Sequence, residues 1–239
     1  MDYRPALRGG DAIHTDTTLS FQKTVRARKS VRSFLSRPVP EAIIHEVLED
    51  ARRAPSNANT QPWNVHIVSG DKLRQLTRAL HEAIGAGRFT PDFSFDTGAF
   101  YGRYKERSFE QGQSYHEAIG VARDDEAARK AAAALNYSFF NAPHVALLFM
   151  PSFGDSVRVA SDIGMYAQTF LLSLTARGLG GVPQTSLGFF AQTMREFLGV
   201  PDELRFLFGI SFGYPDATAP CNRMRTGRDP LSHSVTFHC

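Results

Sequence analysis

Arg28, Lys29, Ser30 and Arg32 form a compact group of cationic and hydroxyl side chains near the start of the chain. A guanidinium presents a planar fork of N–H donors, and a neighbouring hydroxyl adds another donor, so this spacing suits a phosphate group. The alternative is a solvated basic helix face, or one that touches nucleic acid, because runs of charge usually lie in water. Taken alone, the run favours the solvated face.

A second group of polar side chains lies in the segment APSNANTQPW, residues 54–63, between an expected helix and an expected strand. Its amides and hydroxyls suit the hydrogen-bonding edge of a flat heterocycle. Its prolines hold the loop rigid, which lowers the entropy cost of binding. The alternative is a plain connection in which Trp63 packs into the core.

A third segment, GLGGVPQTS at residues 178–186, is rich in glycine. Glycines let the backbone approach a ligand closely. The segment matches neither GxGxxG nor GxxxxGK[ST], so it predicts neither a dinucleotide fingerprint nor a P-loop. The alternative is a helix C-cap followed by a turn.

Helices and strands alternate around these three segments, which indicates a mixed α and β class. The run from residue 21 is consistent with a short basic helix that ends in a loop. Asp71 is a candidate N-cap for the helix that follows the first strand. The patterns predict further helices at about 43–51, 71–86, 126–140, 156–177 and 189–198, and strands at 63–70, 144–150 and 204–215.

Residues 87–123 interrupt this alternation with glycines, a proline, many charges and aromatic residues such as Phe100 and Tyr104. An excursion of this length between regular elements is a lid or a disordered segment. Its aromatic content favours a lid. We therefore expect a tail at residues 1–20, one domain at 21–239 with this lid, and a C-terminal arm at about 216–239.

The composition excludes several classes of protein. The chain has 239 residues, of which 42% are hydrophobic and 21% charged, so it is not mostly disordered. A net charge of +3 is too small to imply nucleic acid unless it is clustered. No run approaches the roughly 20 apolar residues of a membrane helix, and the N-terminus lacks the apolar core of a signal peptide. We expect a cytoplasmic protein.

Cysteine and histidine usage argues against a metal site or a disulfide framework. Cys221 and Cys239 are the only cysteines, and the eight histidines show no spacing such as HExxH. No set of Ser, His and Asp, or of Cys and His, predicts a protein nucleophile. The sequence therefore predicts neither a protein nucleophile nor a metal centre.

Together these segments resemble the FMN-dependent nitroreductase family. RKSVRSF and APSNANTQPW look like its N-terminal signature, GLGGVPQ like its loop over the flavin, and NRMRTGR with PLSHSVTF like its C-terminal arm. The similarity covers roughly residues 21–239. The segment YGRYKERSFEQGQSYHEAIGVARDD resembles the subgroup that includes nitrobenzoate reductases. The resemblance implies a mixed sheet flanked by helices in an obligate homodimer, with two active sites at the interface.

The resemblance also assigns residues to the cofactor. Arg28 and Ser30 would hold the FMN phosphate together with a C-terminal arginine, either Arg228 or Arg225. Arg32 would lie at the pyrimidine edge, near N1 and O2, where reduction places negative charge. The full set of implied contacts is Arg28, Lys29, Ser30, Arg32, Pro55, Ser56, Asn57, Asn59, Asn136, Pro183, Gln184, Thr185, Ser186, Arg225 and Arg228.

Three of these groups have distinct implied roles. Residues 55–59 would reach the flavin of the other subunit, and residues 183–186 would line the ring near N5 and O4, largely through backbone groups. Asn136 would contact the polar edge of the ring. Many members have a Glu-Gly pair where this chain has Thr185 and Ser186. The backbone N–H is therefore expected to matter more there than the side chain.

The implied activity is an NAD(P)H-dependent, ping-pong reduction of a small aromatic acceptor, such as a nitro compound or a quinone. NAD(P)H would deliver hydride to flavin N5 and leave, and no catalytic residue beyond the flavin is required. In the lid, Phe100, Tyr104 and the cations Arg103, Lys105 and Arg107 would shape the pocket and attract an aromatic carboxylate. Solvent exposure of these cations is an equal alternative.

Other functions remain open at this point. Within the family, a reductive dehalogenase of halophenols would use Glu106, Tyr104 and Lys105 of the lid, and a flavin-fragmenting enzyme is more remote. A flavoprotein that only stores or senses FMN would be yellow but not reducible by NAD(P)H. A basic nucleic-acid-binding module would be colourless, with an affinity that falls steeply with salt.

In the dimer, the resemblance implies that the helix at 156–177 packs in the core of the interface. A short strand at residues 235–237 would add to the partner's sheet.

Overall fold

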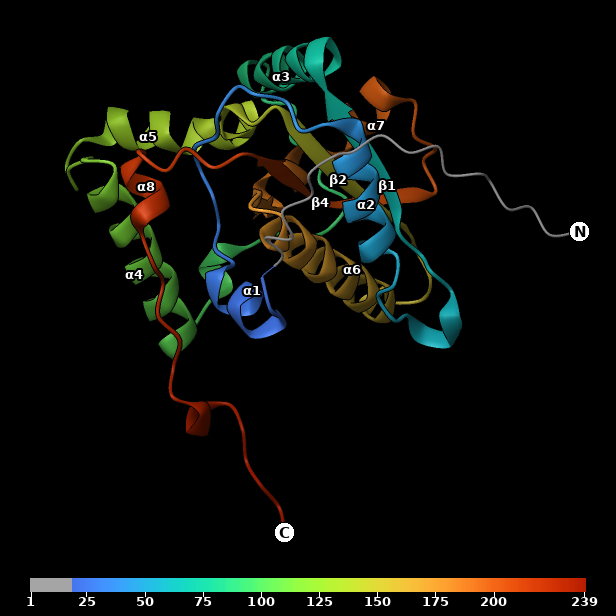
Figure 1. The fold of residues 1–239 in the computed structure, drawn as a ribbon. Coiled ribbons are helices and arrows are strands. Elements are labelled where there is room, and N and C mark those ends of the chain that lie inside the picture. The colour runs from blue at the N-terminus through green and yellow to red at the C-terminus, as the bar shows by residue number, and fades with distance from the viewer. Residues whose placement is uncertain (1–18) are drawn as a thin grey trace, which may run out of the picture.

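The computed structural model describes residues 19–239 and shows a four-stranded sheet packed between helices (Figure 1). The strand order is β1-β2-β4-β3, and the three ladders are antiparallel. Within the described residues the parallel pairing is an isolated bridge between Ser30 and Gly181. The α+β class is confirmed, whereas the expected mixed sheet is antiparallel in its ladders. The strands are β1 (Asn64–Ser69), β2 (His144–Pro151), β3 (Gly180–Gln184) and β4 (Leu204–Gly213).

Strand β2 forms the centre of the molecule, as its continuous apolar run predicts. Its residues are buried from His144 to Met150, and they alternate between two hydrophobic layers. Ala146 and Leu148 face the layer formed with helices α2 (Glu41–Ala51) and α6 (Val157–Ala176). The neighbouring Val145 and Leu147 face the layer formed with α3 (Gly70–Gly85) and α7 (Ala191–Leu198). A strand buried on both faces needs no polar alternation.

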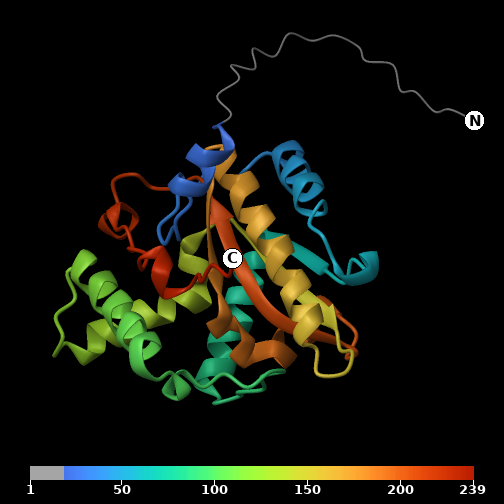
Figure 2. The same ribbon diagram turned by 90° about the horizontal axis from the view of Figure 1, so that it is seen from below.

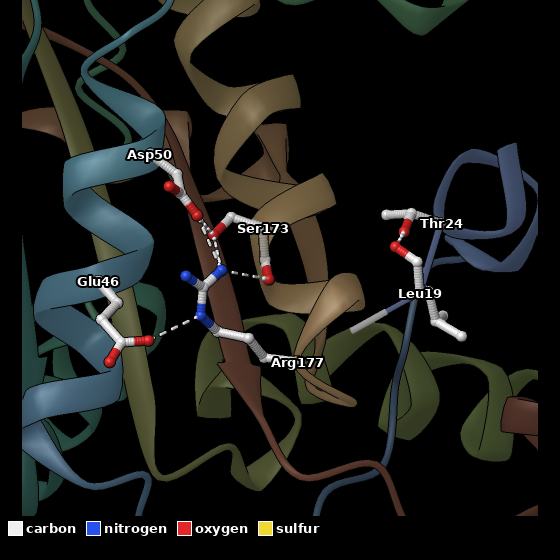
Figure 3. A network of polar contacts seen from close by, with 6 residues as sticks. All are labelled: Leu19, Thr24, Glu46, Asp50, Ser173 and Arg177. Carbon is white, nitrogen blue, oxygen red and sulfur yellow. Dashed lines mark hydrogen bonds and ion pairs between the residues drawn. The ribbon is translucent and has the colours of Figure 1, made fainter. Parts of the chain in front are cut away.

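Helices α2 and α6 lie side by side over one face of the sheet in both views (Figures 1 and 2). Arg177, just after α6, joins them in the network of Figure 3. Its Nη1 donates to Asp50 Oδ2 at 2.8 Å, and its Nε donates to Glu46 Oε2 at 3.2 Å. Ser173 Oγ also donates to Asp50 Oδ2, at 2.7 Å. The network fixes the end of α2, from which the polar loop at residues 54–63 departs.

Strand β3 is a difference from the sequence expectation, which placed a loop and turn at residues 178–186. Gly178 ends α6 in the left-handed region at φ 72°, and Leu179 N–H bonds back to Leu174 O at 2.9 Å. The chain then pairs with β4 from Gly180 to Gln184. A Cβ on Gly181 would lie 3.0 Å from Leu171 Cδ2 and 3.1 Å from Leu174 Cδ1. Close packing against α6, rather than strand propensity, selects glycine at position 181.

The predicted lid is largely helical. The sequence of helix α4 (Gly102–Ala118) has no apolar stripe that would predict a helix. In agreement with this, the helix has no buried residue. Helix α5 (Glu126–Ala134) follows and continues into a 3-10 turn (Leu135–Asn141), where the sequence predicts one helix to about residue 140. In Figure 1, α4 and α5 stand to one side of the sheet.

The C-terminal arm runs along α4 and then away from the body (Figure 1). It contains only the short helix α8 (Pro220–Arg223) and a 3-10 turn (Leu231–His233). The tail at residues 235–237, where a strand is expected, is not in a strand within this single chain. Val235 and Phe237 are 40% and 79% exposed. The expected pairing of this tail with a partner's sheet stays a prediction.

The remaining elements follow the predicted pattern with one local correction. Helix α1 (Phe21–Ala27) is the expected short basic helix, capped by Ser20, whose Oγ accepts from Lys23 N–H. Asp71 lies in the first turn of α3 and does not cap it, because the N-cap is Ser69. The expected tail at residues 1–20 lies outside the described residues up to residue 18. The other 3-10 turns are Asn57–Asn59, Thr97–Ala99 and Thr185–Phe190.

Candidate functional site

The basic segment, residues 28–32, lies against the outer edge of β3. Val31 N–H donates to Gly181 O at 3.2 Å, and Ser30 forms the bridge with Gly181. A Cβ on Gly180 would overlap Val31 Cγ2 and lie 3.1 Å from Pro215 Cγ. Glycine at this position therefore lets the basic segment pack directly on the sheet edge. The structure thus brings together two of the three segments that the sequence singles out.

Asn222, in helix α8, ties the basic segment to the C-terminal arm. The side chain is buried, with 2% exposed. Its Oδ1 accepts from Arg32 N–H at 2.9 Å, and its Nδ2 donates to Ser33 O at 2.7 Å and to Asp216 O at 2.9 Å. Its backbone carbonyl accepts from Lys29 Nζ. Every hydrogen-bonding position of the buried amide is directed at this junction.

Four cations from the two segments form two neighbouring pairs here, Arg28 with Arg228 and Lys29 with Arg225. Burial lowers the pKa of Arg28, and the charge of Arg228 lowers it further. Burial and the charge of Arg225 lower the pKa of Lys29 in the same way. Among residues 19–239, no carboxylate oxygen lies within 4.0 Å of any of these four groups. Such a cluster repels itself until an anion binds, and guanidinium forks suit a phosphate.

A fifth cation, Arg32, is half-buried beside this cluster. Its guanidinium carbon lies 5.2 Å from the ring centroid of Tyr115 in α4, a cation–π distance. Burial lowers the pKa of Arg32, although Tyr115 and Cys221 counteract the shift. Burial likewise raises the pKa of the Tyr115 phenol. The tyrosine is therefore neutral at physiological pH, and the positive charge of Arg32 remains uncompensated.

Gln184 and Asn136 are brought together, but they satisfy each other. Gln184 is 2% exposed, and its Nε2 donates to Asn136 O at 2.8 Å, while its Oε1 accepts from Ser211 Oγ. Asn136 Nδ2 donates to Ala133 O at 3.1 Å. The side chain of Gln184 is thus part of the interior, which leaves backbone groups for a ligand. Nearby Pro183 and Thr185 are exposed and Ser186 is half-buried.

The polar loop after α2 lies elsewhere in the chain. Asn57 N–H donates to the buried Asp162 Oδ2 at 3.1 Å, near the start of α6, whereas the basic segment meets β3 beyond the end of α6. A 20-residue helix spans about 30 Å at 1.5 Å per residue. Residues 55–59 and the basic segment are therefore at opposite ends of α6 and do not meet within one chain. Pro55, Asn57 and Asn59 are exposed and Ser56 is half-buried.

This loop is also strained. Ala58, Asn59 and Gln61 have φ of 49°, 56° and 48°, in the left-handed region that non-glycine residues rarely adopt. Ser56 supports the turn, because its Oγ accepts from Gln61 N–H at 2.9 Å. Strained, exposed backbone held by a buried carboxylate is typical of a binding loop.

The cations of α4 contact the C-terminal arm. Arg107 pairs with Asp229, and Arg103 Nη1 donates to His233 O at 3.1 Å. Between α4 and the arm lies a cavity of about 490 Å³, lined by both helix and arm residues, including Arg107, Arg225 and Arg228. Phe100 and Tyr104 are exposed. The helix, its arginines and the arm form one unit beside the cation cluster.

The sequence did not identify Asn222, Tyr115 or Asp162 as functional residues. Asn222 lies in the quoted NRMRTGR segment, and Tyr115 in the lid segment, but no spacing distinguishes them. Asp162 occupies a buried position on α6, where a carboxylate is itself a signal of a specific partner. Within residues 19–239, no group of three or more His, Cys, Asp or Glu could hold a metal ion. None of the helices in the same range has both the length and the hydropathy of a membrane-spanning segment.

Comparison with known proteins gives a consistent result. A family model described as the Nitroreductase family matches residues 25–214. The nitroreductase NfnB of Mycolicibacterium smegmatis is 40% identical over 233 residues, 98% of each chain. A 4-nitrobenzoate reductase of Nocardioides sp. is 37% identical over 225 residues, 91% of this chain and 90% of that protein.

A solved structure resembles the chain closely. It is the FMN-dependent nitroreductase NfnB from Mycobacterium smegmatis in complex with NADPH, which superposes with a TM-score of 0.87 at 40% identity and covers 91% of this chain and 97% of that one. An iodotyrosine deiodinase of Thermotoga neapolitana is a more distant relative, 26% identical over 199 residues, 82% of this chain and 88% of that protein.

Proposed function

Because the chain belongs to the nitroreductase family, we propose that it is an FMN-dependent NAD(P)H oxidoreductase that reduces nitroaromatic or quinone-type acceptors. Two relatives that are similar over nearly the whole chain are a nitroreductase and a 4-nitrobenzoate reductase, and one similar solved structure is a complex with NADPH. The observation in this chain that carries the proposal is the cluster of Arg28, Lys29, Arg225 and Arg228. Arg28 lies near Arg228 and Lys29 near Arg225, and no carboxylate oxygen of the described chain lies within 4.0 Å of these four groups.

The residues present fit FMN. Arg28, Ser30 and Arg228 would hold its phosphate, and Lys29 and Arg225 would add charge to the same site. The buried amide of Asn222 and the contact with β3 hold this segment rigid before a ligand arrives. A preorganised anion site binds more tightly, because less conformational entropy is lost on binding.

Bound FMN supplies the hydride chemistry, so the protein's part is to bind, orient and provide charge. Arg32 would place a fixed positive charge, partly shielded from water, at the edge of the flavin that becomes more negative on reduction. Backbone groups of residues 183–186 would face the ring, since the Gln184 side chain is committed to Asn136 and Ser211.

The proposal includes a homodimer in which each active site takes residues from both chains. The strained loop at residues 55–59 and the cation cluster lie at opposite ends of α6, so the loop serves a cofactor held by the other subunit. The arm carries the exposed apolar residues Leu231, Val235 and Phe237, which a second subunit would cover. We also propose that the enzyme works in the cytoplasm, where NAD(P)H is available.

The acceptor we propose is an electron-poor aromatic compound, with a nitrobenzoate as the first candidate. Reductive dehalogenation is not supported by the geometry, because Tyr104, Lys105 and Glu106 are consecutive on α4 and point in three directions around it. Three such side chains do not converge on one substrate within this chain.

The test is the visible spectrum of the purified protein, followed by anaerobic addition of NADH and then NADPH. The proposal expects a yellow protein with one FMN per chain, bleached by at least one of the two nucleotides and reoxidised by 4-nitrobenzoate or a quinone. A colourless protein that also fails to bind added FMN would refute it. A yellow protein that neither nucleotide bleaches would instead indicate a flavin store or sensor.

A further inference from the structure

The backbone at Arg32 and Ser33 lies outside the ladders, and one buried side chain bonds to both residues, beside a backbone bond from Asp216 N–H to Ser33 O at 3.1 Å. Isolated bridges hold Ser30 against Gly181 and Phe34 against Pro215, but residues 32 and 33 between them are in no ladder. The Asn222 amide accepts from Arg32 N–H at 2.9 Å and donates to Ser33 O at 2.7 Å, as a neighbouring peptide group would. Because both bonds come from one buried amide, they fix the backbone at Arg32 and the direction in which its side chain leaves it.

The other end of the Arg32 side chain rests on Tyr115. The guanidinium carbon is 5.2 Å from the ring centroid, and both residues are half-buried. An acidic residue would also hold an arginine, but it would cancel the positive charge. A neutral aromatic face attracts the cation through its quadrupole and leaves its full charge available to a ligand. No carboxylate oxygen of residues 19–239 lies within 4.0 Å of the Arg32 guanidinium.

We propose that Tyr115 and Asn222 are positioning residues that hold the Arg32 guanidinium in place, so that the protein binds reduced FMN more tightly than it would with a mobile arginine. This inference rests on the proposed function. The two residues act at opposite ends of one side chain, and they come from α4 and α8, two elements that also contact each other. Together they are expected to increase the affinity for reduced FMN, the more negative form of the cofactor. The reason is that a charge already fixed in place stabilises added negative charge without having to reorganise.

The experiment compares two equilibrium constants in the holoprotein: the dissociation constant of oxidised FMN, and that of dithionite-reduced FMN under anaerobic conditions. Removing the aromatic ring with Tyr115→Leu is expected to raise the ratio of the reduced to the oxidised constant about fivefold, the size of one partly desolvated cation–π contact. Tyr115→Phe keeps the ring and is expected to preserve the ratio. Asn222→Ala is expected to change the ratio in the same direction as Tyr115→Leu.

A matched control lies on the same helix. The guanidinium carbon of Arg123 lies 5.7 Å from the ring centroid of Phe109, so Phe109→Leu removes an arginine–aromatic contact that does not involve Arg32. This variant is expected to leave the ratio unchanged. Equal ratios in Tyr115→Leu and wild type would overturn the inference, as would an equal change in Phe109→Leu.

The outcomes also separate this inference from the proposed function. If Tyr115→Leu lowers the melting temperature and weakens both forms of FMN by the same factor, Tyr115 is only structural and the inference is wrong. If the wild-type protein binds neither form of FMN, the proposed function itself fails. Wild-type binding of both forms, with a ratio that moves only in the Tyr115→Leu and Asn222→Ala variants, supports the inference.

Discussion

Asp92 anchors the start of the segment that leads into α4, and its replacement offers a sharp test of the fold. The side chain is 3% exposed. It accepts from Phe206 N–H at 2.7 Å, from Arg205 Nη1 at 3.3 Å and from Arg195 Nη1. The side chain of Arg195 is itself only 10% exposed, and its Nε makes no hydrogen bond, although Asp202 Oδ1 lies 3.5 Å away. Asp92 is thus the main counterion of a buried arginine.

The substitution Asp92→Asn keeps the shape of the side chain but removes its charge. It leaves the Arg195 guanidinium buried without its counterion, and breaking a buried pair in this way costs about 3–5 kcal/mol of unfolding free energy. The amide oxygen of the new side chain can still accept a hydrogen bond from Phe206 N–H, so this connection to the backbone of β4 is preserved. The loss of unfolding free energy therefore measures the ion pair with Arg195 rather than the hydrogen bond to Phe206.

The assay is urea unfolding at one fixed protein concentration, because dimerisation would make the midpoint depend on concentration. Asp202→Asn is the matched control, since it removes the exposed carboxylate near the same arginine. It is expected to leave the unfolding free energy nearly unchanged. The double substitution Asp92→Asn with Arg195→Met removes the unpaired charge, keeps an acceptor for Phe206 N–H, and is expected to recover most of the loss. If Asp92→Asn is no less stable than Asp202→Asn, the buried pair does not hold this segment.

Three further predictions concern the lid, the anion site and acid stability. Replacing Arg103 and Arg107, which lie one helical turn apart on α4, with Ala should raise the KM for 4-nitrobenzoate but not for a neutral quinone; equal effects would refute a carboxylate site there. Arg228→Ala should weaken FMN binding about thirtyfold, with a smaller salt dependence, because it removes charge-assisted hydrogen bonds to phosphate. Burial alone would raise the pKa of Asp50, but hydrogen bonds from Ser173 and Arg177 and the charge of Arg177 hold it below its ordinary value. The Asp50 carboxylate therefore stabilises the fold at pH values above the pKa of the unfolded state, and this contribution is lost as pH falls through the folded pKa. Asp50→Asn should make the melting temperature fall less steeply as the pH is lowered. An unchanged dependence of the melting temperature on acid pH would contradict this.

The sequence predicts the elements whose residues carry their own signal. Strand β2 is an unbroken apolar run, and α6 repeats its apolar residues at helical spacing until Gly178 ends it. Strand β3 has no such signal, because its two glycines and proline disfavour a strand, and packing against Leu171, Leu174 and Val31 decides its structure. Tertiary contacts overrode local propensity at this edge.

The same distinction applies to α4 and to the site. Helix α4 is polar on all sides, so no apolar period indicates it, and its contacts are made by single side chains such as Tyr115 and Arg107. Residue types singled out the basic and glycine-rich segments, the resemblance to a family assigned them to a cofactor, and the structure brings these two together. Asn222 could not be found in this way, because one asparagine in the arm has no spacing that distinguishes it from a solvated one.

The loop after α2 has a strained backbone that contacts elsewhere in the fold stabilise. Left-handed backbone at Ala58 and Gln61 costs of order 1–3 kcal/mol each, and such conformations persist only when neighbouring contacts impose them. Here one buried carboxylate, Asp162, and one hydroxyl, Ser56, impose the turn while its tip remains exposed. Glycine at position 58 would be more stable, because it adopts a positive φ without steric cost. Strain kept at an exposed tip, at the far end of α6 from the cation cluster, is what we expect of a loop shaped for a ligand that the other subunit holds.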